Sequence, residues 1–173
     1  IAHTRWATHG VPSTKNAHPQ DSGNSIFVVH NGIIENHENL RKKLSKEGFK
    51  FKSDTDTEVI SHLVNLYKTK GYDFDSAVMR TIAELKGAYA LGIIDLENPD
   101  LVIGAREHSP LVVGEGIEEN FIASDVMALS QVTNKFKFLQ DGQIALIGSD
   151  KIQIMSKNGT AKKIPTQEID SNS

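Results

Sequence analysis

The sequence predicts an α+β domain built mostly from antiparallel sheets, and three observations indicate it. Pairs of apolar runs joined by short turn clusters dominate the C-terminal half of the chain, as expected of β-hairpins. Two helical patterns follow one another directly in the middle of the chain. Strand–helix–strand alternation is too weak for a doubly wound parallel sheet.

Three segments carry apolar residues at helical spacing. Asn36 stands at the N-cap position of the first segment. Thr55 and Glu58 have the spacing of a capping box at the start of the second. A glycine follows each segment, which is a common way for a helix to end. The predicted helices are 36–47, 58–70 and 75–86, and the glycines are Gly48, Gly71 and Gly87.

The strands are predicted from short apolar runs and the turn residues between them. The run 26–30 is apolar, and the Asn31-Gly32 pair that follows it is typical of a tight turn with positive φ. Further along the chain, three pairs of runs flank turn-forming residues and predict hairpins. The hairpin pairs are 88–95 with 101–106, 136–139 with 143–147, and 152–155 with 162–164, and two further short strands are 111–113 and 121–123.

Composition and charge exclude several classes of protein. The 173 residues include 19 lysines and arginines against 22 aspartates and glutamates, and this net charge of −3 lacks the basic footprint of a nucleic-acid binder. No apolar run approaches the ~20 residues that span a bilayer, and there is no basic-then-apolar leader. We therefore expect a cytoplasmic protein with no nucleic-acid or membrane partner.

Cysteine is absent, and the chain begins at Ile1 rather than at a methionine. These residues therefore hold no disulfide, no thiolate metal site and no cysteine nucleophile. Residues 1–5 do not resemble a frayed terminus, which is usually polar and small. We expect a piece of a longer protein, with one domain over 1–166 that is incomplete at its N-terminus. The polar composition of 167–173 predicts the start of a linker.

The first polar cluster holds Arg5, Trp6, Thr8 and His9 within five positions. The planar guanidinium of arginine suits a carboxylate, tryptophan can cover a bound ligand, and threonine and histidine can donate orienting hydrogen bonds. A purely structural interpretation is equally open, namely a strand end with an ordinary ion pair and a core tryptophan.

Asn31 and Gly32 also allow two interpretations. On spacing alone a hairpin turn is favoured. In an active site, the side-chain amide of Asn31 and the backbone N–H of Gly32 would point into one small volume. There they would stabilise the oxyanion of a tetrahedral intermediate.

The third polar cluster, residues 53–59, precedes the second predicted helix. Thr55 or Asp56 would cap that helix, and a carboxylate at a helix start could also bind a substrate ammonium. Asp54 and Asp56 compete for this role, and the residues alone do not choose between them.

The seven histidines raise the question of a metal site. Four of them, His3, His9, His18 and His30, lie in the first thirty positions, but none forms a compact helical ligand pair. The glycines at 114 and 116 lack the third glycine and the helix of a phosphate-binding loop. We expect no metal and no cofactor. A zinc-binding β-rich domain that uses His3 or His9 is the least favoured alternative.

Four motifs occur in order along the chain: HTRWATHG at 3–10, NAHP at 16–19, VHNGIIEN at 29–36 and TDTEV at 55–59. Together they resemble the glutaminase domain of the glutamine–fructose-6-phosphate transaminase (isomerising) family, which belongs to the N-terminal-nucleophile amidotransferases. The resemblance continues through LKGAYAL, ARxxSPLVVG, NFIASD and DGQIA, and so covers nearly the whole chain. The tryptophan of the first motif and HNGIIEN favour this family over the related phosphoribosyl-pyrophosphate amidotransferases and asparagine synthetases.

The resemblance implies a four-layer αββα sandwich of the N-terminal-nucleophile hydrolase type. It also implies hydrolysis of the side-chain amide of L-glutamine to L-glutamate and ammonia. Arg5 would bind the α-carboxylate of glutamine and Asp56 its α-ammonium, so the family pattern selects Asp56 over Asp54. His18 and His30 match family positions that we interpret as structural support for the site.

The remaining site residues are also assigned by the resemblance. Trp6, Thr8 and His9 would belong to a loop that closes over glutamine. Asn31 and Gly32 would form the oxyanion hole. These roles agree with those that the residue types suggest by themselves.

The sequence departs from the family in what it lacks. The family's nucleophile is an N-terminal cysteine several dozen residues before the first motif, and sugar-phosphate domains follow the linker. We expect the chain as given to lack glutaminase activity, unless the missing segment exists outside these residues. It would meet fructose 6-phosphate only through the missing domains of an intact enzyme, which is expected to be a homo-oligomer. The main alternative is a non-catalytic amino-acid-binding module, in which Arg5 and Asp56 hold a zwitterion and no reaction follows.

Overall fold

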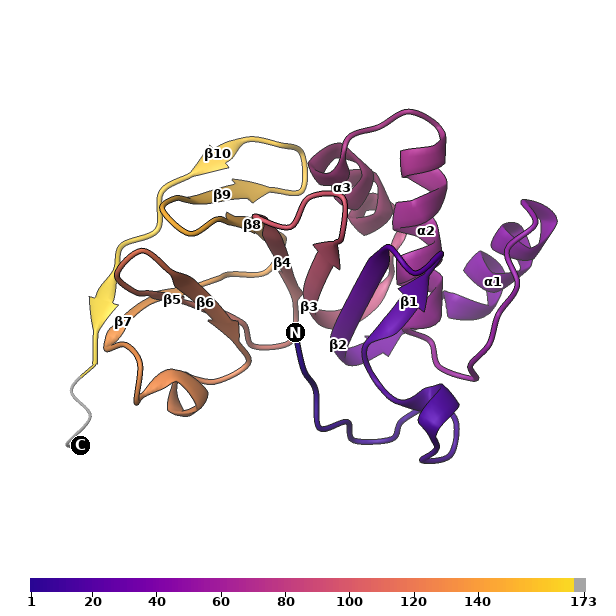
Figure 1. Cartoon of the computed structure of the whole chain (residues 1–173), viewed down its shortest axis with the longest axis horizontal. Helices are drawn as coiled ribbons and strands as arrows, with labels where there is room; N and C mark the ends of the chain where they lie inside the picture. The colour runs from indigo at the N-terminus through magenta and orange to yellow at the C-terminus, as the bar shows by residue number, and fades with distance from the viewer. Residues whose placement is uncertain (170–173) are drawn as a thin grey trace.

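The computed structural model describes residues 1–169, which form helices on one side of two stacked sheets (Figure 1). The helices are α1 (His37–Lys46), α2 (Glu58–Thr69) and α3 (Phe74–Glu84), with the 3-10 turns η1 (Thr14–Asn16) and η2 (Val126–Leu129). The strands are β1 (Gln20–Ser22), β2 (Ile26–Ile34), β3 (Gly87–Asp95), β4 (Val102–Glu107), β5 (Val112–Glu115), β6 (Asn120–Ala123), β7 (Lys135–Phe138), β8 (Gln143–Ile147), β9 (Ile152–Ser156), β10 (Ala161–Lys162) and β11 (Gln167–Glu168).

The larger sheet has seven strands in the order β1-β2-β3-β4-β8-β9-β10, and all its neighbours are antiparallel. The helices α2 and α3 cover one of its faces (Figure 1). Fully buried side chains such as Ile60 and Leu63 of α2 meet Ile93 of β3 and Ile103 of β4 in this layer. The burial of one apolar face of each helix against one face of the sheet forms the main core.

The smaller sheet has four strands in the order β11-β7-β5-β6 and packs on the opposite face of the larger one. The two sheets approach closely at Gly104 of β4, where a Cβ atom would lie 2.5 Å from the Cδ1 atom of Ile122. On the outer face of this sheet, Leu129 of η2 packs with Phe136 of β7. The α+β class with mostly antiparallel sheets is therefore confirmed. In the described residues, the turn η2 is what covers the outer sheet as a fourth layer.

Most sequence predictions for the helices are confirmed. Gly48 and Gly71 follow α1 and α2 with φ values of +93° and +92°, the left-handed conformation in which glycine ends a helix at least cost. Asn36 precedes α1 as predicted, but its side chain does not cap the helix. The Asn36 amide instead donates to the carbonyl of Glu84 and accepts from the N–H of Lys86, which joins the start of α1 to the end of α3.

The predicted turn at Asn31-Gly32 is wrong. Strand β2 continues through both residues to Ile34, and it pairs with β3 over its whole length. Gly32 adopts a φ of +120°, and a Cβ atom there would lie 2.2 Å from the carbonyl oxygen of Ala88. Glycine is therefore needed at position 32 because β2 and β3 approach closely there, although the local Asn-Gly pattern is typical of a turn.

One of the three predicted hairpins is also wrong. The runs 136–139 and 143–147 do form strands, but β7 belongs to the smaller sheet and β8 to the larger one. The Asp141-Gly142 corner thus carries the chain from one sheet to the other. The hairpins β3–β4 and β9–β10 are as predicted, and the two further short strands form the pair β5–β6.

The C-terminal stretch predicted as a linker begins with ordered structure. Gln167 and Glu168 form β11, which pairs with β7, and residues 170–173 lie outside the described residues. Among residues 1–169, no helix has the length and apolar character needed to cross a membrane.

Candidate functional site

A cavity of about 290 Å³ lies at the end of β2, where the N-terminal segment meets the loop before α2. Six of the seven predicted site residues line it, and the seventh, His9, lies behind one of them. The six are Arg5, Trp6, Thr8, Asn31, Gly32 and Asp56, and the other lining residues are His3, His18, His30, Ile33, Thr55 and Thr57. Segments more than fifty residues apart in the sequence therefore form this cavity together.

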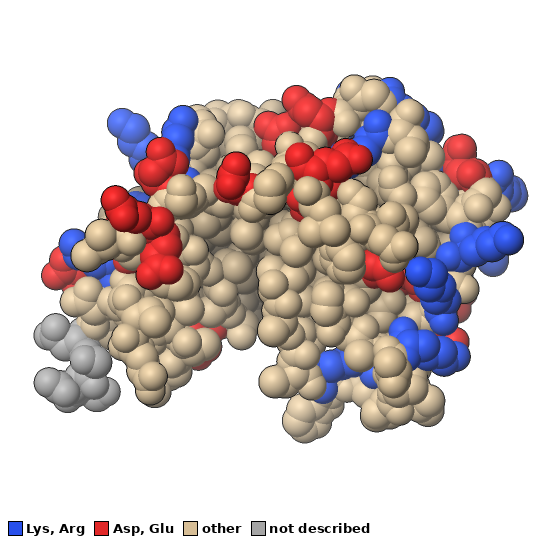
Figure 2. Space-filling model, viewed as in Figure 1, with Lys and Arg blue, Asp and Glu red and all other residues tan. Residues whose placement is uncertain are grey.

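A second cavity of about 150 Å³ shares His3, His30 and Asn31 with the first. Its other lining residues are mostly apolar and come from the N-terminus, from β2 and β3, and from β6 of the smaller sheet. Figure 2 shows the surface hollowed between the part formed by β5–β6 and the part formed by β1–β2, near the N-terminus marked in Figure 1. Most of the lysine and arginine side chains visible in Figure 2 lie toward the end of the molecule that holds α1, and a smaller group lies near β9 and β10.

The free edge of β2 supplies backbone donors to the larger cavity. Just before β2, the carbonyl of Ser25 accepts the N–H of Leu96, and just after β2, the N–H of Glu35 donates to the carbonyl of Lys86. Both bonds lie on the side of β2 that faces β3. In an antiparallel pair the directions of the N–H groups alternate along a strand. The N–H of Gly32 therefore points away from β3, to the edge that β1 leaves uncovered.

The carboxylate of Asp56 lies against this same edge. Its Oδ2 accepts the N–H of Ile34 at 2.8 Å, and the Asp56 side chain is only 4% exposed. The Nδ1 atoms of His9 and His30 lie 3.8 and 4.0 Å from its oxygens. Within residues 1–169, no lysine or arginine pairs with Asp56. A buried carboxylate of this kind favours a cationic ligand, because burying an unpaired charge is costly.

Asp54, the competing carboxylate, is placed differently. Its side chain is 54% exposed and forms an ion pair with Lys15 at 2.8 Å. The side chain of Asn16 also bridges to it, since Asn16 Nδ2 donates to Asp54 Oδ2 and Asn16 Oδ1 accepts the Asp54 N–H. Hydrogen bonds to Lys15 and Asn16 lower the pKa of Asp54. Asp54 is therefore a satisfied surface residue that does not line the cavity.

Arg5 provides the opposite charge. Its Nη2 donates to the carbonyls of His9 (2.5 Å) and Gly10 (3.2 Å), which folds the loop 5–10 around the guanidinium. No aspartate or glutamate among residues 1–169 lies within salt-bridge distance of Arg5. Its Nε and Nη1 donors are also not used by those residues. They are available to a carboxylate in the cavity.

The other residues of the first cluster form the outer rim. Trp6 is 90% exposed and Thr8 is exposed, so neither packs into the core. The structural interpretation of Trp6 as a core tryptophan is therefore wrong. His9 is half-buried, and its ring stacks edge-on against His37 at 4.8 Å.

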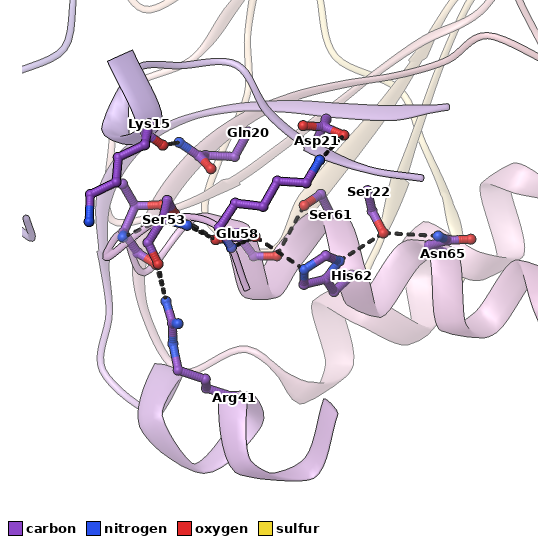
Figure 3. Close-up of polar contacts among 12 residues, drawn as sticks. Lys15, Gln20, Asp21, Ser22, Arg41, Ser53, Glu58, Ser61, His62 and Asn65 are labelled. Atoms are coloured by element: carbon purple, nitrogen blue, oxygen red, sulfur yellow. Dashed lines mark hydrogen bonds and ion pairs between the residues drawn. The ribbon is translucent and has the colours of Figure 1, made fainter. Parts of the chain in front are cut away.

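The loop that carries Asp56 is held by Glu58, at the start of α2 (Figure 3). The Glu58 carboxylate accepts the N–H groups of Lys52 and Ser53 and the hydroxyl of Ser53. Its contact with His62 at 3.3 Å continues to Ser22 of β1, whose Oγ is 2.8 Å from His62 Nδ1. The predicted capping box with Thr55 is wrong, because the carboxylate bonds residues 52 and 53 instead.

Charge within this network is stabilised by hydrogen bonds. Burial by itself would raise the pKa of Glu58, but hydrogen bonds from His62, from the backbone of Lys52 and from Ser53 lower it to about 2. Glu58 is therefore ionised at neutral pH, and its charge helps to hold the loop 52–58 against β1.

Two histidines, the half-buried His18 and the buried His30, share the hydroxyl of Thr57. His18 Nε2 lies 2.9 Å and His30 Nδ1 lies 3.0 Å from Thr57 Oγ1. Burial lowers the pKa of both histidines, that of His18 to about 4, with the nearby charges of His3 and His30 adding to the effect on His18. Both rings are therefore neutral at pH 7. Sequence reasoning missed the bridging role of Thr57, since nothing local links positions 18, 30 and 57.

Among residues 1–169, the N-terminal histidines are not part of any group of three side chains placed to share a metal ion. In the part of the chain that the structure describes, the one group of three acidic or histidine side chains close enough to share an ion is Glu107, His108 and Asp141. Two cations already pair with it, Lys157 with Glu107 and Arg106 with Asp141. The zinc interpretation based on His3 and His9 has no support in this geometry.

Comparisons with known proteins show the family of this chain. A family model described as a glutamine amidotransferase domain matches residues 3–131, and the chain therefore belongs to the glutamine amidotransferase family. The chain is 52% identical over 170 residues to a glutamine–fructose-6-phosphate aminotransferase (isomerizing) of Acinetobacter baylyi (strain ATCC 33305 / BD413 / ADP1). It is 53% identical over 172 residues to the protein of that name from Escherichia coli (strain K12). These matches cover 98% and 99% of the chain but 28% of the length of each relative.

Solved structures show the same fold at lower identity. A glutamine phosphoribosylpyrophosphate amidotransferase from B. subtilis matches 90% of this chain and 34% of its own chain, with a TM-score of 0.74 and 24% identity. A structure described as the allosteric regulatory enzyme of purine biosynthesis matches 83% of this chain and 31% of its own, with a TM-score of 0.69. This likeness supports the N-terminal-nucleophile type of fold that the motifs imply.

Proposed function

We propose that this domain binds L-glutamine in the larger cavity and supports hydrolysis of its side-chain amide to L-glutamate and ammonia. One observation carries the proposal. The guanidinium of Arg5 and the buried carboxylate of Asp56 line the same cavity, and neither has a partner of opposite charge other than histidine among residues 1–169. An α-amino acid, with one carboxylate and one ammonium, complements this pair of charges.

The free edge of β2 would supply the two donors of an oxyanion hole. A ligand held at its head by Arg5 and Asp56 would extend its side chain toward Asn31 and the outward N–H of Gly32. When a nucleophile adds to the amide carbon, the carbonyl oxygen becomes an oxyanion. Two fixed donors at this position would stabilise it by roughly 3–4 kcal/mol each if they resemble a protease oxyanion hole.

The nucleophile is not among these residues, because the 173 residues contain no cysteine. In the family that the motifs resemble, it is an N-terminal cysteine. The smaller cavity offers a route for it, since this cavity reaches Asn31 and His30 from the side of the N-terminus. A cysteine presented there would approach the amide carbon next to the Asn31 donor.

The relatives suggest a larger reaction. Their printed name, glutamine–fructose-6-phosphate aminotransferase (isomerizing), implies that the released ammonia aminates fructose 6-phosphate. For this protein, that step would take place in domains outside the present sequence. A homo-oligomeric enzyme in the cytoplasm fits this assignment and is part of the proposal.

Calorimetric titration of the chain with L-glutamate and with L-glutamine tests the proposal. Both amino acids are expected to bind, and Asp56→Asn should weaken binding about 10- to 100-fold, because one charge-assisted contact is worth about 1.5–3 kcal/mol. Asp54→Asn is the matched control. It removes an equal charge two residues away from a position outside the cavity, so binding should change by less than about twofold.

Two outcomes would contradict the proposal. One is a chain that binds neither amino acid, and the other is an equal effect of the two substitutions. Binding without ammonia release, even when the cysteine-bearing segment is supplied, would favour the alternative of a non-catalytic amino-acid-binding module.

A further inference from the structure

His3 connects two site residues that are 26 positions apart in the sequence. Its Nδ1 lies 2.9 Å from the backbone nitrogen of Arg5, and its Nε2 lies 2.5 Å from Oδ1 of Asn31. The ring is half-buried and lines both cavities. His3 thus lies between the residue that would bind the ligand's carboxylate and the residue that would bind its amide oxygen.

These two contacts determine which nitrogen of His3 carries the proton. A backbone N–H can only donate, so Nδ1 of His3 must accept from Arg5 and therefore has no hydrogen. In the neutral ring the proton is then on Nε2, which donates to Asn31. Only the oxygen of the Asn31 side-chain amide can accept a hydrogen bond from this N–H. The amide is therefore oriented with Oδ1 toward His3.

The orientation of Asn31 decides what it offers to the cavity. Because Oδ1 accepts from His3, the NH₂ group is the part of the Asn31 amide that is left to bind a ligand. No hydrogen bond of this group to any of residues 1–169 is present, and Asn31 lines both cavities. The reversed amide would turn an acceptor toward the ligand, and an acceptor repels a developing oxyanion.

Neighbouring side chains hold the His3 ring in place. It stacks against the ring of His18 with 4.6 Å between centroids. His18 in turn is bonded to Thr57 at the start of α2. Because His30 Nε2 faces the carbonyl of Ala88 at 3.4 Å, His30 Nδ1 is the acceptor of the Thr57 hydroxyl, whose oxygen then accepts from His18 Nε2. The hydrogen bonds that hold His18 beside His3 therefore all run in one direction, from His18 to Thr57 and from Thr57 to His30.

We propose that His3 is a positioning residue that holds the Asn31 amide with its NH₂ group toward the ligand. This inference rests on the proposed function, in which that NH₂ group binds the side-chain oxygen of L-glutamine. It adds a residue that acts through Asn31. It also couples the backbone at Arg5 to the orientation of the oxyanion donor.

The test compares two ligands that differ only at the amide. L-Norvaline has the head group of L-glutamine and a methyl group in place of the carboxamide. We expect His3→Leu to reduce the preference for L-glutamine over L-norvaline about five- to tenfold, the value of one hydrogen bond, while L-norvaline binding stays within about twofold. His3→Gln can accept from Arg5 and donate to Asn31, so it should restore most of the preference.

The outcomes separate this inference from the proposed function. If the unmodified chain binds L-glutamine no better than L-norvaline, the proposed contact between Asn31 and the amide is wrong, whatever His3 does. If the unmodified chain prefers L-glutamine and His3→Leu keeps the full preference, the positioning role of His3 is overturned. Loss of binding of both ligands in His3→Leu would mean a merely structural role.

A spectroscopic measurement tests His3 without any ligand. Long-range proton–nitrogen NMR correlation of the folded chain distinguishes the two neutral tautomers of a histidine. We expect a bare Nδ1 and a protonated Nε2 for His3, and the same pattern for His18. A protonated Nδ1 in neutral His3 would be incompatible with the Arg5 contact and would overturn the inference.

Discussion

The carboxylate of Asp56 accepts the backbone N–H of Ile34 at 2.8 Å. This contact attaches the loop before α2 to the free edge of β2, two residues beyond Gly32 and on the same side of the strand. The group proposed to bind the ligand's ammonium is therefore hydrogen-bonded to the strand that carries the backbone proposed to bind its amide oxygen. The hydrogen bond to Ile34 thus fixes the position of the Asp56 carboxylate relative to the N–H of Gly32.

Replacement of Arg5 by lysine should weaken binding although the charge is kept. Lysine lacks the planar fork that can bind a carboxylate through two parallel hydrogen bonds while still bonding the loop carbonyls. We expect the dissociation constant for L-glutamate to rise about tenfold in calorimetry. Arg80→Lys is the control, because Arg80 stacks on Tyr72 outside the cavity. Equal affinities of Arg5→Lys and the unmodified chain would argue against a bidentate contact.

Replacement of Gly32 by alanine should destabilise the fold more than the same change at Gly48. Both glycines have positive φ, so both variants carry the strain of about 1–2 kcal/mol expected of a left-handed alanine. Only at Gly32 would the new methyl group meet backbone, 2.2 Å from the Ala88 oxygen, whereas nothing lies within 4 Å at Gly48. Urea unfolding of the two variants should show a larger loss for Gly32→Ala, and equal losses would contradict the close approach of β2 and β3.

Stability should fall as the pH drops from about 6.5 toward 4. Burial lowers the pKa of His18 in the folded chain to about 4, while the unfolded chain protonates near the ordinary value of 6.5. Between these values the unfolded state binds more protons, so acid favours unfolding. Thermal midpoints measured from pH 7.5 to 4 should therefore decrease, and His18→Gln should flatten that decrease. Parallel curves for the two proteins would show that His18 does not cause it.

Glu58→Gln should destabilise the domain by about 1.5–3 kcal/mol, because the carboxylate accepts several hydrogen bonds in a buried network. The low pKa of Glu58, about 2, means that its contribution is present above pH 4.5 and lost as the pH falls toward 2. The variant should thus lose less stability than the unmodified chain over that range. Urea unfolding at several pH values measures both effects. Glu119→Gln, at an exposed position, should change neither.

Local patterns predicted those parts of the fold that local interactions decide. The glycine stops at Gly48 and Gly71 depend on one residue's preference for positive φ, and they are found where the sequence places them. Apolar spacing likewise predicted the buried stripe of α2, because a helix with such a stripe must turn it toward a core. These predictions needed no knowledge of which strand pairs with which.

Predictions at the site were weaker where a distant partner decides the outcome. Asn31-Gly32 has the pattern of a turn, and only the pairing of β2 with β3 keeps both residues in a strand. The capping box at Glu58 failed for a similar reason, since the carboxylate bonds the N–H groups of Lys52 and Ser53 instead. At Asn31-Gly32 the deciding partner is another strand, and at Glu58 it is a pair of backbone N–H groups just before the predicted cap.

From the sequence alone come the α+β class, the three helices with the glycine stops of α1 and α2, the hairpins β3–β4 and β9–β10, and the ordered motifs that indicate an amidotransferase. Only the tertiary structure decides that Asp56 is buried at the cavity while Asp54 lies in solvent, and that His3 faces Asn31. Burial and hydrogen-bond direction depend on which distant segments share a space, and that information is spread over the whole chain rather than contained in any one motif.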